Sequence, residues 1–137
     1  MSGWERPPQR DPWTARGLLR RESCGPLVPV MHPAGRRAYS CGPTCGHRDL
    51  YAEPVEQDLL LKALVRAAFA LKHPALVSPE EARRWGAVNP LDPHAMLAAG
   101  FVHVDVDHTG RCRPAWRHES DRSRSGLARI SRRGSSA

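Results

Sequence analysis

The stretch RRAYSCGPTCGHRDLYAEPVE, residues 36–56, decides how the first third of the chain folds. It places Cys41, Cys45 and His47 within seven residues and then continues into the acidic, proline-containing start of a helix. Thiolates and imidazoles are the ligands that structural zinc sites use most often. The spacing Cys-x-x-x-Cys-x-His therefore predicts one side of a metal-binding site.

A structural zinc site needs four ligands, which usually come from two neighbouring turns. The only cysteine before this stretch is Cys24, seventeen positions before Cys41. In a Cys-x-x-Cys knuckle ending at Cys24, the first ligand would be residue 21, but this residue is Arg21. A guanidinium stays protonated and cannot coordinate a cation. The hypothesis is one structural Zn²⁺ held by four side chains: Cys24, Cys41, Cys45 and His47.

The spacing leaves a second interpretation open, in which the site has lost its metal and the cysteines are unrelated thiols near an exposed histidine. His32 is a reserve ligand if His47 points away from the site. Cys112 is distant in sequence and is expected to be a small apolar residue on a strand. We expect a cytoplasmic protein, and in a reducing compartment four cysteines favour metal binding or free thiols over disulfides.

The segment around the cysteines has the pattern of short β-strands. Residues 27–30 and 37–41 are rich in β-prone side chains, and the sequence His-Pro-Ala-Gly at 32–35 separates them. This turn composition predicts a β-hairpin. Pro29 lacks a backbone donor, so it should lie on an edge strand.

Residues 54–71 form the clearest predicted helix. Pro54 suits the first helical position, acidic residues precede the helix centre, and Lys72 follows its end. The apolar residues at 60, 64, 67, 68 and 71, widened by 61 and 65, predict the buried stripe, with Lys62 and Arg66 facing solvent. An amphipathic helix with this much apolar surface should pack on the rest of the chain, on a partner or on a second copy.

Three further elements follow the long helix. Ser78-Pro79-Glu80-Glu81 is a capping box that predicts a short helix ending at Gly86, and Asp92-Pro93 predicts another that stops at Gly100. Residues 101–107 alternate apolar and polar side chains, and residues 111–117 can return as a second strand of a hairpin. The predicted fold class is α+β: a small zinc β-ribbon, an amphipathic helix, short helices and a C-terminal β-hairpin.

The ends of the chain are polar, charged and without apolar periodicity, which predicts disordered basic tails. We therefore divide the chain into a flexible N-terminal tail, a zinc β-ribbon-like module, a helical segment with the C-terminal hairpin, and a disordered basic tail. Their boundaries are 1–16, 17–52, 53–117 and 118–137. Trp13 either attaches the first segment to the ribbon or belongs to the disordered tail.

The charge is strongly positive. The net charge is +7, and 19 of the 21 basic residues are arginine, whose planar guanidinium suits phosphate. A nucleic-acid partner would explain this charge, but an arginine-rich solvated surface or a GC-rich genome would explain it equally well. No apolar stretch is long enough to span a membrane, so no membrane association is expected.

The segment GLLRRESCGPLVPVMHPAGRRAYSCGPTCGHRDLYAEPVEQDLL resembles the recombinase zinc β-ribbon of large serine recombinases. The matching features are an apolar pair, x-x-Cys-Gly-x-Leu at 22–27, Tyr-x-Cys at 39–41, Cys45 and the sequence Ala-Glu-Pro-Val-Glu at 52–56. This resemblance covers about a third of the chain. The part of the recombinases that it matches is their DNA-binding accessory region, and their catalytic domain has no counterpart in this sequence. It departs from the pattern at Arg21, where the family has the first cysteine.

The resemblance implies a non-catalytic zinc-ribbon protein that binds the phosphate backbone of DNA, alone or as the remnant of a mobile element. The arginines it assigns to phosphate contacts lie near the hairpin and in the C-terminal tail: Arg36, Arg37, Arg48, Arg132 and Arg133. An alternative is a protein-interaction module in which helix 54–71 binds a partner or forms a homodimer. We predict no enzymatic activity, because the sequence contains no paired carboxylates, phosphate-binding loop or activated nucleophile.

Overall fold

The computed structural model describes residues 12–42 and 45–121, and these residues form an α+β fold with two small sheets. The predicted fold class is therefore confirmed. The elements in chain order are β1 (Leu19–Arg21), β2 (Gly25–Pro26), β3 (Val28–Met31), β4 (Arg37–Ser40), β5 (Leu50–Tyr51), α1 (Ala52–Lys72), a 3₁₀ turn η1 (Pro74–Leu76), α2 (Pro79–Ala87), α3 (Pro93–Gly100), β6 (Phe101–Val106) and β7 (Cys112–Trp116).

The predicted hairpin around the cysteines forms the smaller sheet, in the order β3-β4-β5. Pro29 pairs with Tyr39 and lies on the edge strand β3, as its missing donor requires. The turn between β3 and β4 closes through a hydrogen bond from the Gly35 N–H to the His32 carbonyl. Gly35 has a φ of 77°, which L side chains rarely adopt, so glycine suits this turn.

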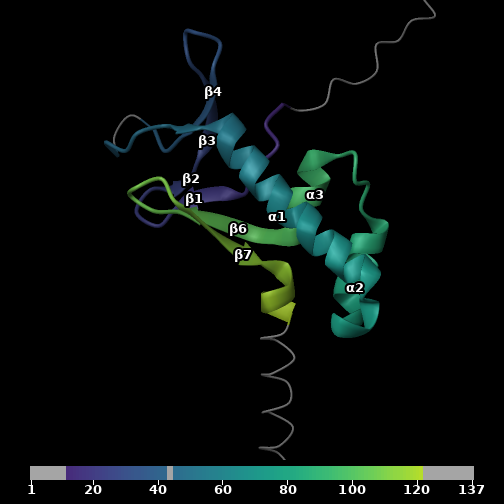
Figure 1. Ribbon diagram of the computed structural model, residues 1–137. Coiled ribbons are helices and arrows are strands. Elements are labelled where there is room, and N and C mark those ends of the chain that lie inside the picture. Colours follow the sequence, from purple (N-terminus) through teal and green to yellow (C-terminus); the bar gives the residue numbers. More distant parts are fainter. Residues whose placement is uncertain (1–11, 43–44, 122–137) are drawn as a thin grey trace, which may run out of the picture.

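The larger sheet joins strands β1 and β2 to the C-terminal hairpin β6–β7, in the order β2-β1-β6-β7. The C-terminal hairpin β6–β7 was predicted, but the parallel pairing of β1 with β6 was not. This pairing places Leu19 opposite Val104, and both side chains are buried. Residues 17–52 and 53–117, which we treated as separate segments, consequently share one sheet (Figure 1).

Helix α1 follows β5 directly, contacts β4 and β5 of the smaller sheet, and also contacts both short helices α2 and α3 (Figure 1). Its buried face differs from the predicted apolar stripe. The face in the core consists mainly of small residues: Ala52, Glu56, Leu59, Ala63, Ala67 and Ala70. Leu61, Leu64, Val65 and Leu71 are instead exposed. Alanines allow the helix axis to approach its neighbours closely, so the bulkier leucines lie on the outer face. Of the predicted stripe, Ala67 is buried and Leu60 packs against the core, but the other residues face outward, so the prediction of the inward face was wrong for most of the stripe.

The short helices begin at the predicted caps. The Ser78 hydroxyl accepts a hydrogen bond from the Glu81 N–H, and the Asp92 carboxylate accepts one from the Ala95 N–H. Helix α2 continues to Ala87, slightly beyond the predicted stop at Gly86. Gly100 ends α3, and a Cβ at this position would lie 3.2 Å from the Trp85 ring. A side chain there would require the buried Trp85 ring to shift slightly.

A buried ion pair fixes α2 against α1. Both oxygens of the Glu81 carboxylate accept hydrogen bonds from Arg66, at 2.7 Å each, and the Trp85 indole N–H donates another at 3.1 Å. Burial alone would raise the pKa of Glu81, but these donors outweigh it and lower the pKa below its usual value. Arg66, predicted to face solvent, is therefore a structural residue.

Residues 12–16 of the predicted N-terminal tail make specific contacts with the fold. Ala15 is fully buried, and its N–H donates a hydrogen bond to the Tyr39 hydroxyl. Tyr39 in turn donates to Glu56, which also accepts from the Thr14 N–H. The Trp13 ring packs edge-on against Tyr39. Ala15 thus belongs to the core and Trp13 packs against it, and residues 1–11 lie outside the described part of the chain.

The first residues of the predicted C-terminal tail, 118–121, are part of the fold. Residues 117–121 form a helical turn, and the Asp121 carboxylate pairs with Arg84 of α2 at 3.1 Å. Residues 122–137, with Arg132 and Arg133, lie outside the described residues. Among the helices in the described ranges, none is both long and apolar enough to cross a membrane.

Candidate metal centre

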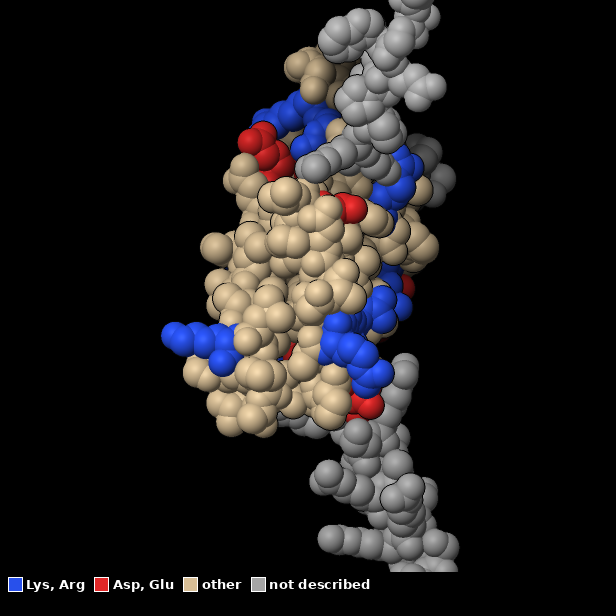
Figure 2. Space-filling model, turned by 90° about the vertical axis from the view of Figure 1, so that its right-hand side faces the viewer, with Lys and Arg blue, Asp and Glu red and all other residues tan. Residues whose placement is uncertain are grey.

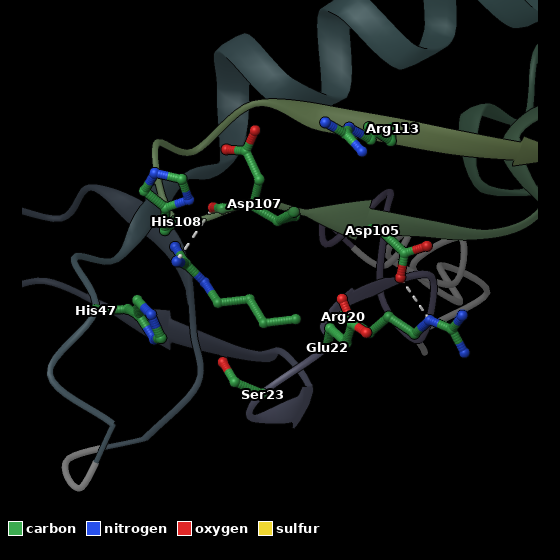
Figure 3. Close-up of a pocket in the computed structure, with 10 residues that line it drawn as sticks. Arg20, Glu22, Ser23, His47, Asp105, Asp107, His108 and Arg113 are labelled. Carbon is green, nitrogen blue, oxygen red and sulfur yellow. Dashed lines mark hydrogen bonds and ion pairs between the residues drawn. The ribbon is translucent and has the colours of Figure 1, made fainter.

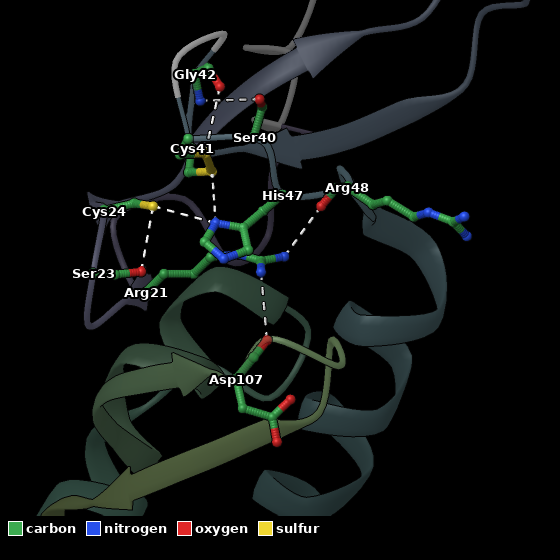
Figure 4. Close-up of a disulfide and its surroundings, with 10 residues drawn as sticks. Arg21, Ser23, Cys24, Ser40, Cys41, Gly42, His47, Arg48 and Asp107 are labelled. Carbon is green, nitrogen blue, oxygen red and sulfur yellow. Dashed lines mark hydrogen bonds between the residues drawn. A yellow bond between two sulfur atoms is a disulfide. The ribbon is translucent and has the colours of Figure 1, made fainter.

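The four predicted ligands meet at one place. One ligand atom each from Cys24, Cys41, Cys45 and His47 lies within 4.8 Å of the other three (Figure 4). Cys24 follows β1, Cys41 follows β4, and His47 lies in the loop that leads to β5. The two distant segments come together because the hairpin β3–β4 returns the chain to the end of β1. This group could hold a metal ion.

His47 lies between the sulfurs. Its Nδ1 atom is 3.3 Å from the Cys24 sulfur and 3.8 Å from the Cys41 sulfur. Figure 4 shows the same ring nitrogen facing both cysteines, so the imidazole is already turned toward them. The loop reverses direction at Gly46, whose φ of 67° lies in the left-handed region that favours glycine. The backbone therefore presents His47 inward.

Cys41 and Cys45 are joined by a disulfide, with their Cα atoms 6.5 Å apart. This differs from the expectation of metal-bound or free thiols. A tight loop that directs two cysteines to one metal also brings their sulfurs close enough to form a disulfide. The same backbone geometry is therefore compatible with the metal-bound and the disulfide state. Because the metal binds the thiolate form, a four-ligand site requires this bond to be reduced. Cys24 is a free thiol.

Arg21 occupies the position of the missing ligand and is buried, with 5% of its surface exposed. Its guanidinium donates to the backbone carbonyls of Arg48, at 3.1 Å, and Asp107, at 3.4 Å. We call residues 41–49, between β4 and β5, the cysteine loop. The two hydrogen bonds of Arg21 attach this loop to the turn between β6 and β7. The sequence indicated only that Arg21 cannot coordinate a metal; its role as a connection between the two sheets was missed.

His32 is not needed as a reserve ligand. Its Nε2 atom lies 2.7 Å from the Asp49 carboxylate, and its ring packs edge-on against Tyr51. The hydrogen bond with His32 lowers the pKa of Asp49. Cys112 is half-buried on β7 and packs against the core, as predicted, and burial raises the pKa of its thiol. Neither residue belongs to the group of four ligands.

An open hollow of about 660 Å³ lies beside this group, between β1, the β6–β7 turn and His47 (Figure 3). Cationic and acidic side chains alternate around it. Asp105 receives a 2.7 Å hydrogen bond from Arg20, which lowers the pKa of the carboxyl group. Asp107 accepts hydrogen bonds from Thr109 and the Arg111 N–H, which lower its pKa to about 2. These carboxylates hold the local structure, and the mixed charges favour no particular ligand.

The arginines predicted to bind phosphate have different environments. Arg37 donates to both oxygens of Glu56, which is buried, so it is a structural residue. Arg36 is exposed, and its guanidinium stacks on the Tyr51 ring at 3.5 Å. Arg48 is also exposed, and Figure 4 shows its side chain extending away from the cysteines. Arg36 and Arg48 are thus the two predicted contacts, within the described residues, that can reach a partner.

The positive charge is concentrated at the C-terminal end of the sequence, where residues 122–137 contain five arginines and no acidic residue. Residues 12–42 and 45–121 contain 14 Lys and Arg against 12 Asp and Glu, which leaves +2 of the total +7. In Figure 2, lysine and arginine form separate groups around a broad uncharged surface and make no continuous stripe on the visible face.

Comparison with known proteins found no match: no family model, curated protein or solved structure is similar to this chain.

Proposed function

We propose that the protein is a non-catalytic DNA-binding protein whose cysteine loop is held by a structural zinc ion, in the manner of the accessory region of a serine recombinase. The observation that carries the proposal is the convergence of Cys24, Cys41, Cys45 and His47 from two distant segments. The protein would act by itself or as the remnant of a mobile element. No catalytic residue is part of this proposal.

The donor set favours zinc. Three thiolates and one imidazole form a standard structural zinc site, whereas calcium and magnesium prefer oxygen ligands. Three thiolates around a divalent ion leave a net charge of −1. The buried guanidinium of Arg21, which borders the same hollows as His47, would compensate this charge. With Arg21 beside the metal, the net charge of the site would be zero.

The proposed DNA contacts are electrostatic. Arg36 and Arg48 lie on the cysteine-containing part of the fold and are exposed. The basic residues beyond residue 121, including Arg132 and Arg133, supply most of the remaining positive charge. Contacts of this kind bind phosphates without reading bases, so the affinity should depend strongly on salt and weakly on sequence.

Binding to a short DNA duplex, measured by fluorescence anisotropy, should be strongest at about 50 mM salt and fall steeply toward physiological salt. Replacing Arg36 and Arg48 by serine should lower the slope of log affinity against log salt by about one for each phosphate that the variant can no longer neutralise. The matched control is Arg83→Ser, because Arg83 is exposed on α2, away from the cysteine loop. An absence of binding at low salt would reject the DNA proposal.

A further inference from the structure

Helix α1 has two apolar faces, and only one of them is buried in the described part of the fold. The exposed face carries Leu61, Leu64, Val65 and Leu71, with exposed fractions of 62%, 39%, 63% and 57%. Ala68 is also exposed between them. We call these five residues the outer stripe of α1. Single exposed leucines are common on protein surfaces. A contiguous row of exposed apolar side chains on one helix face is instead typical of an interaction site.

The spacing of the outer stripe is that of a helix–helix seam. Leu61, Leu64, Ala68 and Leu71 follow one another at intervals of three, four and three residues, which are the a and d positions of a heptad. Val65 occupies the neighbouring e position. A helix with this pattern buries its stripe best against another helix that carries a similar pattern.

The charges on the same face are arranged by sign along the helix. Asp58 lies near the N-terminal end, where it pairs with Lys62 at 2.9 Å and keeps 54% of its side chain exposed, and the exposed Lys72 lies at the C-terminal end. Both occupy the same heptad position as Val65. In an antiparallel pair of identical helices, e positions face e positions, so Asp58 of one copy would meet Lys72 of the other. A parallel pair offers no such attraction.

We propose that the protein forms a homodimer through the outer stripe, with the two α1 helices antiparallel. Around the twofold axis, Leu61 packs against Leu71 of the second copy, and Leu64 packs against Ala68, whose small side chain allows close approach. Val65 meets its own equivalent near the axis, and an Asp58–Lys72 pair closes each end. This inference is independent of the metal site and of DNA binding, because α1 residues 58–72 belong to neither.

Light scattering coupled to size-exclusion chromatography, over a range of protein concentrations, tests the dimer. The full chain should elute with twice its monomer mass at high concentration. The double variant Leu61→Glu/Leu64→Glu should weaken association on the order of a hundredfold or more, because it buries charges in an apolar seam. The control variant is Leu91→Glu, since Leu91 is 70% exposed outside the stripe. Circular dichroism should show that both variants keep their helices.

The charge pair tests the antiparallel orientation. Asp58→Lys and Lys72→Asp should each weaken the dimer, and the double variant Asp58→Lys/Lys72→Asp should associate more tightly than either single variant, because the pair is then reversed. Asp58→Lys alone is the matched comparison, since both it and the double variant lose the pair between Asp58 and Lys62 of the same helix. Failure of the double variant to recover would overturn the orientation. A protein that stays monomeric at all concentrations, or a dimer unaffected by the glutamate substitutions in the stripe, would overturn the proposed interface.

Discussion

Replacing Cys24 with alanine should abolish tight zinc binding by the reduced protein. Cys24 is the only ligand from the first segment, and its sulfur lies 3.3 Å from His47. Loss of a residue that merely orients a ligand costs about 10–100-fold in metal affinity, so loss of a ligand should cost at least the upper end of that range. Competition with a chromogenic chelator measures the effect.

The matched control is Cys112→Ala. Cys112 is the other free cysteine in the described part of the chain, but it lies on β7 and packs against the core. Its loss should leave zinc affinity unchanged, although it removes some packing. Equal zinc affinity in Cys24→Ala and the unaltered protein would show that Cys24 is not a ligand.

The second large effect concerns stability. Glu81→Ala should lower the free energy of unfolding by about 3 kcal/mol, because breaking a buried ion pair leaves the remaining partner uncompensated. The substitution removes both hydrogen bonds from Arg66 and the one from Trp85. Glu80→Ala is the control on the same helix, because Glu80 is exposed and should change stability by less than about 0.5 kcal/mol. Urea denaturation followed by circular dichroism measures both values.

The same pair has a pH dependence whose direction follows from the lowered pKa of Glu81. Since the folded-state pKa lies below the unfolded value of about 4.3, the charged pair contributes fully above that pH. Its contribution is lost as the pH falls through the folded-state pKa. The difference in stability between the unaltered protein and Glu81→Gln should therefore shrink on acidification. A difference that grows toward acid pH would contradict this assignment.

Local signals in the sequence predicted most individual elements. The caps at Ser78 and Asp92 and the turn before Gly35 act through neighbouring backbone groups, so they are visible in a few consecutive residues. The parallel pairing of β1 with β6 joins Leu19 to Val104 across most of the chain, and no local pattern encodes it. Residues 12–16 were misassigned for the same reason, because their partners Tyr39 and Glu56 are distant in sequence.

The inward face of α1 could not be read from hydrophobicity. One face of this helix is rich in alanine and another is rich in leucine, so two faces are apolar. The size of the side chains determines which face is buried. Close packing against α3, α2 and strand β4 selects the alanine face, a choice that depends on the neighbouring elements. The spacing of the cysteines did predict which ligands converge. It did not predict the disulfide between Cys41 and Cys45, because a metal site and a disulfide require similar proximity.

The most direct test of the account is the zinc content of the reduced protein, purified without chelator and measured by elemental analysis. We expect one zinc per chain, with loss of zinc and a lower melting temperature after EDTA treatment. Protein in which Cys41 and Cys45 are oxidised should hold none, because those two sulfurs are then unavailable. Reduced protein that contains well under one zinc per chain and melts unchanged in EDTA would contradict the proposed metal centre.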